Sequence, residues 1–205
     1  MQIISHRGYW RDPGEKNARS AFERTVASGF GTETDVRDLA GRLVVSHDPP
    51  QGGEMAWSEL LAMFAGSGLP LAVNIKSDGL APMLKAAFAE WDAPWFAFDM
   101  SGPETVRYAR EGLPFYTRHS DVEPQPVLYA EAQGVWLDSF TNDQWILPDM
   151  VNGHLDAGKA VCVVSSELHG RDPSALWERL GRLKDVAGVT LCTDRPEEAK
   201  AALDL

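Results

Sequence analysis

Eight short apolar runs, separated by segments with helical periodicity, constrain the fold of this chain more than any other feature. The runs are rich in β-branched and aromatic residues, which favour buried strands. Over 205 residues they recur about every 26 residues, which is enough chain for one strand, one helix and two loops. They are Gln2–Ser5, Thr32–Val36, Leu71–Ile75, Trp95–Phe98, Pro114–Thr117, Gly134–Leu137, Ala160–Val164 and Gly188–Cys192.

The segments between these runs place apolar residues on one helical face. In Asn17–Ser28, for example, Ala21, Phe22 and Val26 share such a face. The early proline in Ser101-Gly102-Pro103-Glu104 is typical of a helix start. The predicted helices are Asn17–Ser28, Ser58–Ala65, Ala81–Trp91, Glu104–Arg110, Asp143–Leu155, Ser174–Leu183 and Glu197–Leu203.

The alternation continues without a linker and predicts one α/β domain over residues 1–205 with a parallel sheet. Eight units favour a single compact (β/α)8 TIM barrel, and an open doubly wound sheet is the alternative. The fifth unit is the least clearly marked in the sequence. Gly41–Ser46 predicts one additional strand after a tight turn at Ala40.

The composition excludes several classes of protein. With 44% hydrophobic and 24% charged residues, the chain is typical of folded rather than disordered proteins. A net charge of −11 leaves no basic stripe, so we expect no nucleic-acid partner. We see no signal segment after Met1 and no apolar stretch near the roughly 20 residues that span a bilayer, which predicts a cytoplasmic location. Cys162 and Cys192 lie in apolar runs and are expected to be buried free thiols.

Polar side chains follow almost every predicted strand. In a TIM barrel the functional site lies where the strands end and the following loops begin. We therefore expect the chemistry of this chain among the residues at those positions. They are His6, Arg7, Glu33, Asp35, His47, Asp48, Asn74, Lys76, Asp99, Arg118, His119, Asp138, Glu167, His169, Thr193 and Asp194.

Glu33 and Asp35 are two residues apart on one predicted strand, so both carboxylates project from the same face. Two like charges in a partly buried site are unfavourable unless a cation lies between them. A hard divalent ion with oxygen ligands, Mg²⁺ or Ca²⁺, fits this pair. The alternatives are an exposed pair balanced by Arg37 or water, or one protonated carboxyl.

His6 and His47 end neighbouring segments on either side of the carboxylate pair. Two such histidines could act as general base and general acid, although each could also be a structural, hydrogen-bonded residue. The guanidinium of Arg7 suits a pair of phosphate oxygens, or equally a structural ion pair. Asp48 is interpreted as a turn residue rather than a partner of His47, and Asp194 as a helix N-cap.

Lys76 and Arg118 follow the third and fifth strands and are candidates for binding an anionic substrate. For Lys76 a Schiff-base role is an alternative that nothing beyond its position favours.

Three short motifs follow one another within about the first 50 residues: Ser5-His6-Arg7-Gly8, Glu33-Thr34-Asp35 and His47-Asp48. Together with Asn17, Ala21-Phe22, Gly29, Gly41 and Leu43–Ser46, this order resembles the opening of the glycerophosphodiester phosphodiesterase family. Thr193-Asp194-Arg195-Pro196 resembles the family's last strand–helix junction.

The resemblance implies a (β/α)8 barrel, a divalent metal and cleavage of a small phosphodiester substrate. It implies His6 and His47 as the acid–base pair and Arg7 on the phosphate. It also implies Glu33 and Asp35 as metal ligands.

Two positions depart from the family pattern. Asn74 occupies the place of a third metal-binding carboxylate, two residues before the retained Lys76, so we expect a weakly held ion. Lys16 stands where the family has a glutamate. Two further readings remain open beside hydrolysis: a non-catalytic barrel that binds glycerophosphodiesters, and a lyase-type transfer that gives a cyclic phosphate.

Overall fold

The computed structural model describes residues 1–205, which divide into two compact units. The N-terminal unit is Ser5–Phe115, and the C-terminal unit combines Met1–Ile4 with Tyr116–Leu205. Strand β1 (Gln2–His6) contributes residues to both units. The single domain over residues 1–205 stays a prediction.

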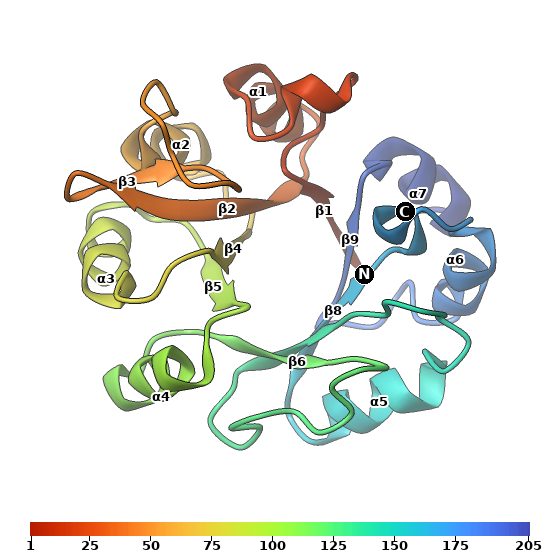
Figure 1. Ribbon diagram of the computed structural model, residues 1–205. Helices are drawn as coiled ribbons and strands as arrows, with labels where there is room; N and C mark the ends of the chain where they lie inside the picture. Colours follow the sequence, from red (N-terminus) through yellow and green to blue (C-terminus); the bar gives the residue numbers. More distant parts are fainter. The chain divides into compact units, whose positions relative to one another are not determined.

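The N-terminal unit is a mainly parallel sheet with helices packed along it (Figure 1). Its strands follow the order β5-β4-β2-β1, and β3 pairs antiparallel with the last residues of β2. After β1, its elements are η1 (Pro13–Glu15, a 3₁₀ turn), α1 (Arg19–Ala27), β2 (Gly31–Leu39), β3 (Arg42–Val45), α2 (Trp57–Phe64), β4 (Leu71–Ile75), α3 (Ala81–Glu90), β5 (Trp95–Phe98) and α4 (Gly102–Glu111).

Local sequence signals explain several of these elements. Every residue of β4 is buried, which accounts for its nearly continuous apolar sequence. Ser101 caps α4 because its side chain accepts the backbone N–H of Glu104 at 3.3 Å. Gly112 ends the same helix in the left-handed conformation, with φ +64°, which glycine adopts without a steric penalty.

The C-terminal unit repeats the same alternation of strand and helix. Its strands β6, β7, β8 and β9 are parallel neighbours in that order. The elements are β6 (Tyr116–His119), β7 (Gly134–Leu137), α5 (Pro148–Asp156), β8 (Ala160–Val164), η2 (Ser166–His169, a 3₁₀ turn), α6 (Ser174–Gly181), β9 (Val189–Thr193) and α7 (Pro196–Leu203).

Two regions had the least clear secondary-structure signals in the sequence, the extra strand and the fifth repeat unit, and the structure agrees with the prediction fully only for the first. The extra strand predicted at Gly41–Ser46 is confirmed as β3. The fifth repeat strand begins two residues later than predicted from Pro114–Thr117, because Pro114 has no N–H for a strand ladder. No helix lies between β6 and β7.

The capping role predicted for Asp194 is wrong. The residue before α7 is Arg195, and it makes no side-chain cap. The backbone N–H of Asp194 instead donates to Glu167 Oε1 at 3.0 Å. The carboxylate of a residue distant in sequence therefore orders this junction, and no local pattern could indicate that.

Two further expectations concern the cysteines and the helices. Cys162 and Cys192 are buried free thiols, as predicted. None of the helices combines the length and the apolar character needed to cross a membrane.

Candidate functional site

Six predicted site residues lie together in the N-terminal unit, where β1, β4 and the parallel part of β2 end. Asp35 on β2 is the register partner of Asn74 on β4. Backbone hydrogen bonds tie the next residues to β2, from Arg7 N to Glu33 O at 2.9 Å and from Lys76 N to Val36 O at 3.1 Å. We call this group the carboxylate site: His6, Arg7, Glu33, Asp35, Asn74 and Lys76.

Asp35 is the electrostatic centre of the carboxylate site. Its side chain is fully buried, and its Oδ2 lies 2.9 Å from Arg7 Nε. Oδ1 lies 3.3 Å from Lys76 Nζ, and Asn17 Nδ2 donates to Oδ2 at 2.8 Å. Arg7 and Lys76, both predicted to bind the substrate, are thus held in place by the carboxylate of Asp35. Because two cations share one carboxylate, this group of three side chains carries one net positive charge.

Glu33 lies two residues before Asp35 and behaves differently. It is buried, its Oε2 has no hydrogen-bond partner, and this oxygen lies 3.9 Å from His6 Nε2. Burial, followed by the nearby charge of Asp35, raises the pKa of Glu33 well above its ordinary value. Arg7, Lys76 and Asn74 oppose this rise without cancelling it. Glu33 therefore differs from Asp35 in its contacts, because it lacks the close cations that surround Asp35.

Asn74 takes the place of a third carboxylate, and Asp99 orients its side-chain amide. Its Nδ2 donates to Asp99 Oδ2 at 3.4 Å, while its Oδ1 is buried without a hydrogen-bond partner. Asp99 ends β5 in the left-handed conformation, with φ +63°. Because a carboxylate only accepts hydrogen bonds, Asp99 directs the nitrogen of the amide toward itself and leaves the oxygen for another ligand.

The oxygen atoms of the carboxylate site fit a hard divalent cation. Glu33 Oε2, Asp35 Oδ1 and Asn74 Oδ1 are all buried and accept no hydrogen bond, although Asp35 Oδ1 is ion-paired with Lys76 at 3.3 Å. Buried polar atoms in folded proteins almost always have a partner, so Glu33 Oε2 and Asn74 Oδ1, which lie on adjacent strands and accept no hydrogen bond, are suited to hold a cation. Mg²⁺ and Ca²⁺ prefer oxygen donors. No group of three His, Cys, Asp or Glu side chains in residues 1–205 could hold a metal ion, so Glu33 and Asp35 form no such cluster with a third side chain of these types.

His6 belongs to this site through its position at the end of β1. Its side chain is mostly buried and is close to Glu33, as the 3.9 Å separation above shows. The indole N–H of Trp10 donates to the His6 carbonyl at 3.2 Å and closes the loop that follows. The imidazole therefore lies beside Glu33 at the end of β1.

His47 lies in the loop after β3 and is more exposed than His6. Ser46 N donates to Asp35 O at 3.1 Å, which fixes the start of this loop beside β2. Arg37 Nε donates to the carbonyl of His47 at 3.0 Å. Asp48 Oδ1 lies 3.0 Å from His47 Nδ1, so the prediction that Asp48 is only a turn residue is wrong.

A cavity of about 580 Å³ opens between the loop after β1 and the loops around β3 and α2. We call it the rim pocket. Arg7 and His47 line it, so it adjoins the groups predicted to carry out the chemistry. The other polar side chains in its wall include Lys16, Asn17, Arg19, Asp48 and Glu54.

Asn17 has a structural role that the sequence did not reveal. Its Nδ2 donates to Asp35, its Oδ1 accepts the hydroxyl of Thr34 at 2.9 Å, and its backbone N donates to Arg7 O at 2.9 Å. It has φ +61°, a conformation that asparagine tolerates better than most residues. The only sequence signal was its place among the residues that carry the family resemblance.

Gly8 allows the loop after β1 to turn closely over α1. It has φ +84°, and a Cβ atom at this position would lie 2.7 Å from the Cβ of Ala21. Both the backbone conformation and the available space require glycine here. The turn positions Arg7 immediately before it.

Arg118, also predicted to bind substrate, belongs to the C-terminal unit. There its Nη1 lies 3.2 Å from Asp138 Oδ2, and its Nε lies 3.2 Å from Glu123 Oε2. The guanidinium also lies 5.1 Å from the ring of Phe140. Its substrate-binding role stays a prediction.

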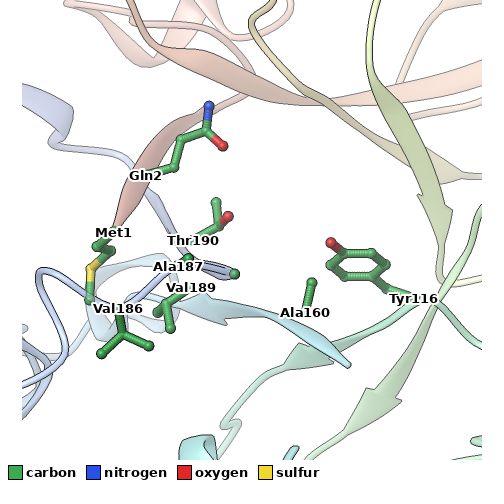
Figure 2. A pocket seen from close by; sticks show the side chains of 9 residues that line it. Met1, Gln2, Tyr116, Ala160, Val186, Ala187, Val189 and Thr190 are labelled. Atoms are coloured by element: carbon green, nitrogen blue, oxygen red, sulfur yellow. The ribbon is translucent and has the colours of Figure 1, made fainter. Parts of the chain in front are cut away.

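A second cavity, of about 280 Å³, lies where the strands of the C-terminal unit begin (Figure 2). Gln2, Tyr116, Ala160 and Thr190 line it, and Figure 2 shows the Tyr116 ring facing this space. The side chains in its wall include no carboxylate, imidazole or guanidinium. In α/β folds of this kind ligands bind at the other end of the strands, so this cavity is not the candidate site.

Parallel strands alternating with helices, and a polar site where the strands end, define a TIM-barrel-like α/β protein. The chain is similar in structure to a glycerophosphodiester phosphodiesterase from Parabacteroides distasonis, with a TM-score of 0.72 and 20% identity. That match covers 99% of this chain and 96% of the other. The TIM-barrel fold class that the sequence predicted is confirmed by this full-length match.

A second solved structure is similar over the whole chain. It is a Ca²⁺-dependent phosphatidylinositol-specific phospholipase C from Streptomyces antibioticus, with a TM-score of 0.65 and 10% identity. The match covers 100% of this chain and 96% of that one. No family model and no curated protein matches the sequence. The shared property is therefore the fold, which both phosphodiesterases have.

Proposed function

We propose that this chain is a metal-assisted phosphodiesterase that cleaves a small glycerophosphodiester-like substrate. The observation that carries the proposal is the carboxylate site, where three buried oxygens that accept no hydrogen bond lie beside Arg7, Lys76 and His6. This arrangement is suited to a divalent ion and an anionic ligand together.

Glu33, Asp35 and Asn74 would hold the divalent ion, which supplies positive charge to the oxygens of the bound phosphate. Arg7 presents a planar, always charged group that can hold two phosphate oxygens, and Lys76 adds a compact charge. Asp35 keeps both side chains in position, which reduces the reorganisation needed when the substrate binds.

His6 and His47 would transfer the protons. Because the ionised Asp48 carboxylate can only accept, Nδ1 of a neutral His47 carries the proton and Nε2 is free to accept another. This orientation suits His47 to act as the general base on the attacking hydroxyl. His6 would then protonate the alcohol that leaves.

The test is the turnover of a chromogenic diester, bis(p-nitrophenyl) phosphate, by the purified protein. We expect activity that EDTA removes and that Mg²⁺, Mn²⁺ or Ca²⁺ restores. His47→Gln should lower turnover by about 10²–10⁴-fold. His154→Gln, which changes a histidine on α5 of the other unit, is the matched control and should leave most of the activity.

Two results would contradict the proposal. The absence of turnover with any of the three ions would favour a non-catalytic barrel that binds phosphodiesters. Full activity after exhaustive chelation would remove the metal from the mechanism. With glycerophosphoglycerol as substrate, ³¹P NMR separates hydrolysis, which gives a phosphomonoester, from a lyase-type transfer, which gives a cyclic phosphate.

A further inference from the structure

Asp35 depends on its neighbours for the orientation of its carboxylate. The terminal torsion of an aspartate side chain is broad, so its own rotamer does not fix the plane of the two oxygens. Arg7 Nε lies 2.9 Å from Oδ2 but makes no aligned hydrogen bond, and Lys76 Nζ is a compact charge 3.3 Å from Oδ1. Both cations attract the carboxylate without setting its rotation.

Asn17 supplies the directional contact. Its Nδ2 donates to Asp35 Oδ2 at 2.8 Å, whereas Oδ1 accepts no hydrogen bond. With Oδ2 engaged in this way, Oδ1 is the oxygen that lies beside Lys76. The amide of Asn17 therefore determines how the carboxylate presents its second oxygen.

Thr34 in turn orients the amide of Asn17. Because the Asp35 carboxylate only accepts hydrogen bonds, the amide nitrogen of Asn17 faces it and the amide oxygen faces Thr34. The hydroxyl of Thr34 donates to this oxygen at 2.9 Å, and Thr34 is fully buried. Two hydrogen bonds of opposite direction thus fix both ends of the amide.

The backbone of Asn17 is held in an uncommon conformation. Its φ is +61°, and its N–H donates at 2.9 Å to the carbonyl of Arg7, which has φ +59°. The other non-glycine residues of the N-terminal unit with positive φ are Asp99, beside the carboxylate site, and Ala40, in the turn between β2 and β3. Such conformations cost energy and cluster at functional sites. The strained backbone of this unit therefore coincides largely with the carboxylate site, and Asn17 belongs to it.

We propose that Asn17 and Thr34 are positioning residues for the proposed reaction, because they fix the rotation of the Asp35 carboxylate. In this orientation Asp35 keeps Arg7 and Lys76 in place for the phosphate and leaves one oxygen for the divalent ion. The inference rests on the proposed function, since it concerns the ion and the anionic ligand assigned there. Removing a partner that orients a metal-binding side chain typically changes metal affinity or activity by about 10- to 100-fold.

Isothermal titration calorimetry measures the effect without turnover. Asn17→Gly removes the amide, keeps the backbone N–H and tolerates the positive φ. We expect it to weaken the binding of Ca²⁺ or Mg²⁺ by about 10-fold. Binding of propyl phosphate in EDTA should weaken by about 3- to 10-fold, because Arg7 and Lys76 lose a fixed partner. Ala40→Gly, which also places glycine at a positive φ in the same unit, is the matched control and should bind both probes like the wild type.

Variants of Thr34 separate positioning from packing. Thr34→Val removes the hydroxyl and keeps the branched shape, whereas Thr34→Ser keeps the hydroxyl. We expect Thr34→Val to weaken the binding of both probes and Thr34→Ser to retain the wild-type affinities. Thr105→Val removes a buried hydroxyl on α4 that donates to the carbonyl of Ser101 at 2.9 Å, and it should leave both affinities unchanged. Urea unfolding checks that each variant is folded.

Three results would overturn the inference. The first is an Asn17→Gly variant that binds both probes as tightly as the wild type. The second is an equal loss of affinity in Ala40→Gly or Thr105→Val, since the effect would then be general. The third is an equal loss in Thr34→Ser and Thr34→Val, since packing rather than the hydroxyl would then be responsible.

Turnover of bis(p-nitrophenyl) phosphate separates this inference from the function on which it rests. Losses of affinity confined to Asn17→Gly and Thr34→Val, in a protein that does not cleave the diester, would support the positioning role and overturn the proposed function. Cleavage by the wild type, with affinities and kcat unchanged in both variants, would support the proposed function and overturn the positioning role. A wild-type protein that binds neither probe would overturn both.

Discussion

The strands of both units end in similar polar residues, but the two units use them differently. In the C-terminal unit Asp138 accepts from His169 Nε2 at 2.7 Å, from Ser139 N at 2.7 Å and from Arg118 Nη1 at 3.2 Å. Glu167 accepts the hydroxyl of Thr193 and the backbone N–H of Asp194. These carboxylates are satisfied by the protein itself.

In the N-terminal unit three buried oxygens accept no hydrogen bond, although one of them, on Asp35, is ion-paired with Lys76. Glu33 Oε2, Asp35 Oδ1 and Asn74 Oδ1 are the examples. An unpartnered atom alone does not identify a site, since Glu104 Oε1 on α4 is also buried without a partner. The distinction is that three of them lie on the adjacent strands β2 and β4, where Arg7 and Lys76 pair with Asp35. A polar side chain at a strand end thus indicates a functional site where its buried atoms accept no hydrogen bond from the protein. Where the protein supplies all the hydrogen bonds, the side chain has a structural role.

The largest expected difference between the units is in turnover. His6→Gln and His47→Gln should each reduce kcat by about 10²–10⁴-fold, and the double variant should be far less than multiplicatively worse, since the two would act in one displacement. His169→Gln, in the C-terminal unit, should change kcat by less than about 10-fold. Steady-state kinetics on folded variants decide this. If His169→Gln lowered kcat as much as His47→Gln, the claim that only the polar residues of the N-terminal unit are catalytic would be wrong.

The second expected difference is in stability. Asp138→Ala removes a mostly buried carboxylate and leaves Arg118 and His169 without their shared partner, so the free energy of unfolding should fall by about 2–3 kcal/mol. Asp35→Ala should abolish the response to metal whatever it does to stability. Urea unfolding and metal titration measure the two effects separately. A metal response that disappears in Asp138→Ala, while the variant stays folded, would contradict the division of roles.

A smaller effect, on metal affinity, is expected at Asn74, where the sequence departs from the family pattern. Asn74→Asp gives the site a third carboxylate, and calcium and magnesium sites gain affinity with ligand charge. We expect metal binding to tighten by about 10-fold, without a matching rise in turnover, because the added charge also repels the substrate phosphate. Calorimetric titration with Mg²⁺ and Ca²⁺ checks the first part. Unchanged affinity would mean that residue 74 does not contact the ion.

The smallest expected effect is a pH dependence specific to the C-terminal unit. His154 lies between His119 at 3.0 Å and the Tyr129 hydroxyl at 2.8 Å, and burial lowers the pKa of both histidines. Between these lowered values and the ordinary value near 6.5, the unfolded chain binds more protons than the folded one. This part of the stability is fully present above pH 6.5 and declines as the pH falls below it.

Urea unfolding between pH 7 and pH 5 measures that decline. The variant His119→Gln/His154→Gln should show a flatter dependence on pH, while Tyr129→Phe, which keeps both imidazoles, should retain the original slope. A slope that does not change in the double histidine variant would assign the effect to other groups.

The sequence by itself determined the features that depend on local periodicity. Alternating apolar runs and helical segments predicted every strand of the repeat and every helix, although α5 begins at Pro148, five residues after its predicted start. The bounds of β4, Leu71–Ile75, were predicted without error. The two-residue period of a strand predicted Glu33 and Asp35 on one face, and in the structure both lie in β2, where the charge of Asp35 acts on Glu33. Local patterns suffice here because backbone geometry repeats along the chain.

Only the tertiary structure decided which polar groups have partners. Asp35 is held by Arg7, Asn17 and Lys76, which come from separate parts of the chain, and Asp99 orients the amide of Asn74 from a neighbouring strand. The same contacts make the electrostatics of Glu33 and Asp35 different, although the sequence presents them as equivalent. Hydrogen bonds and burial depend on residues brought together by folding, and the pattern along the chain does not record those distances.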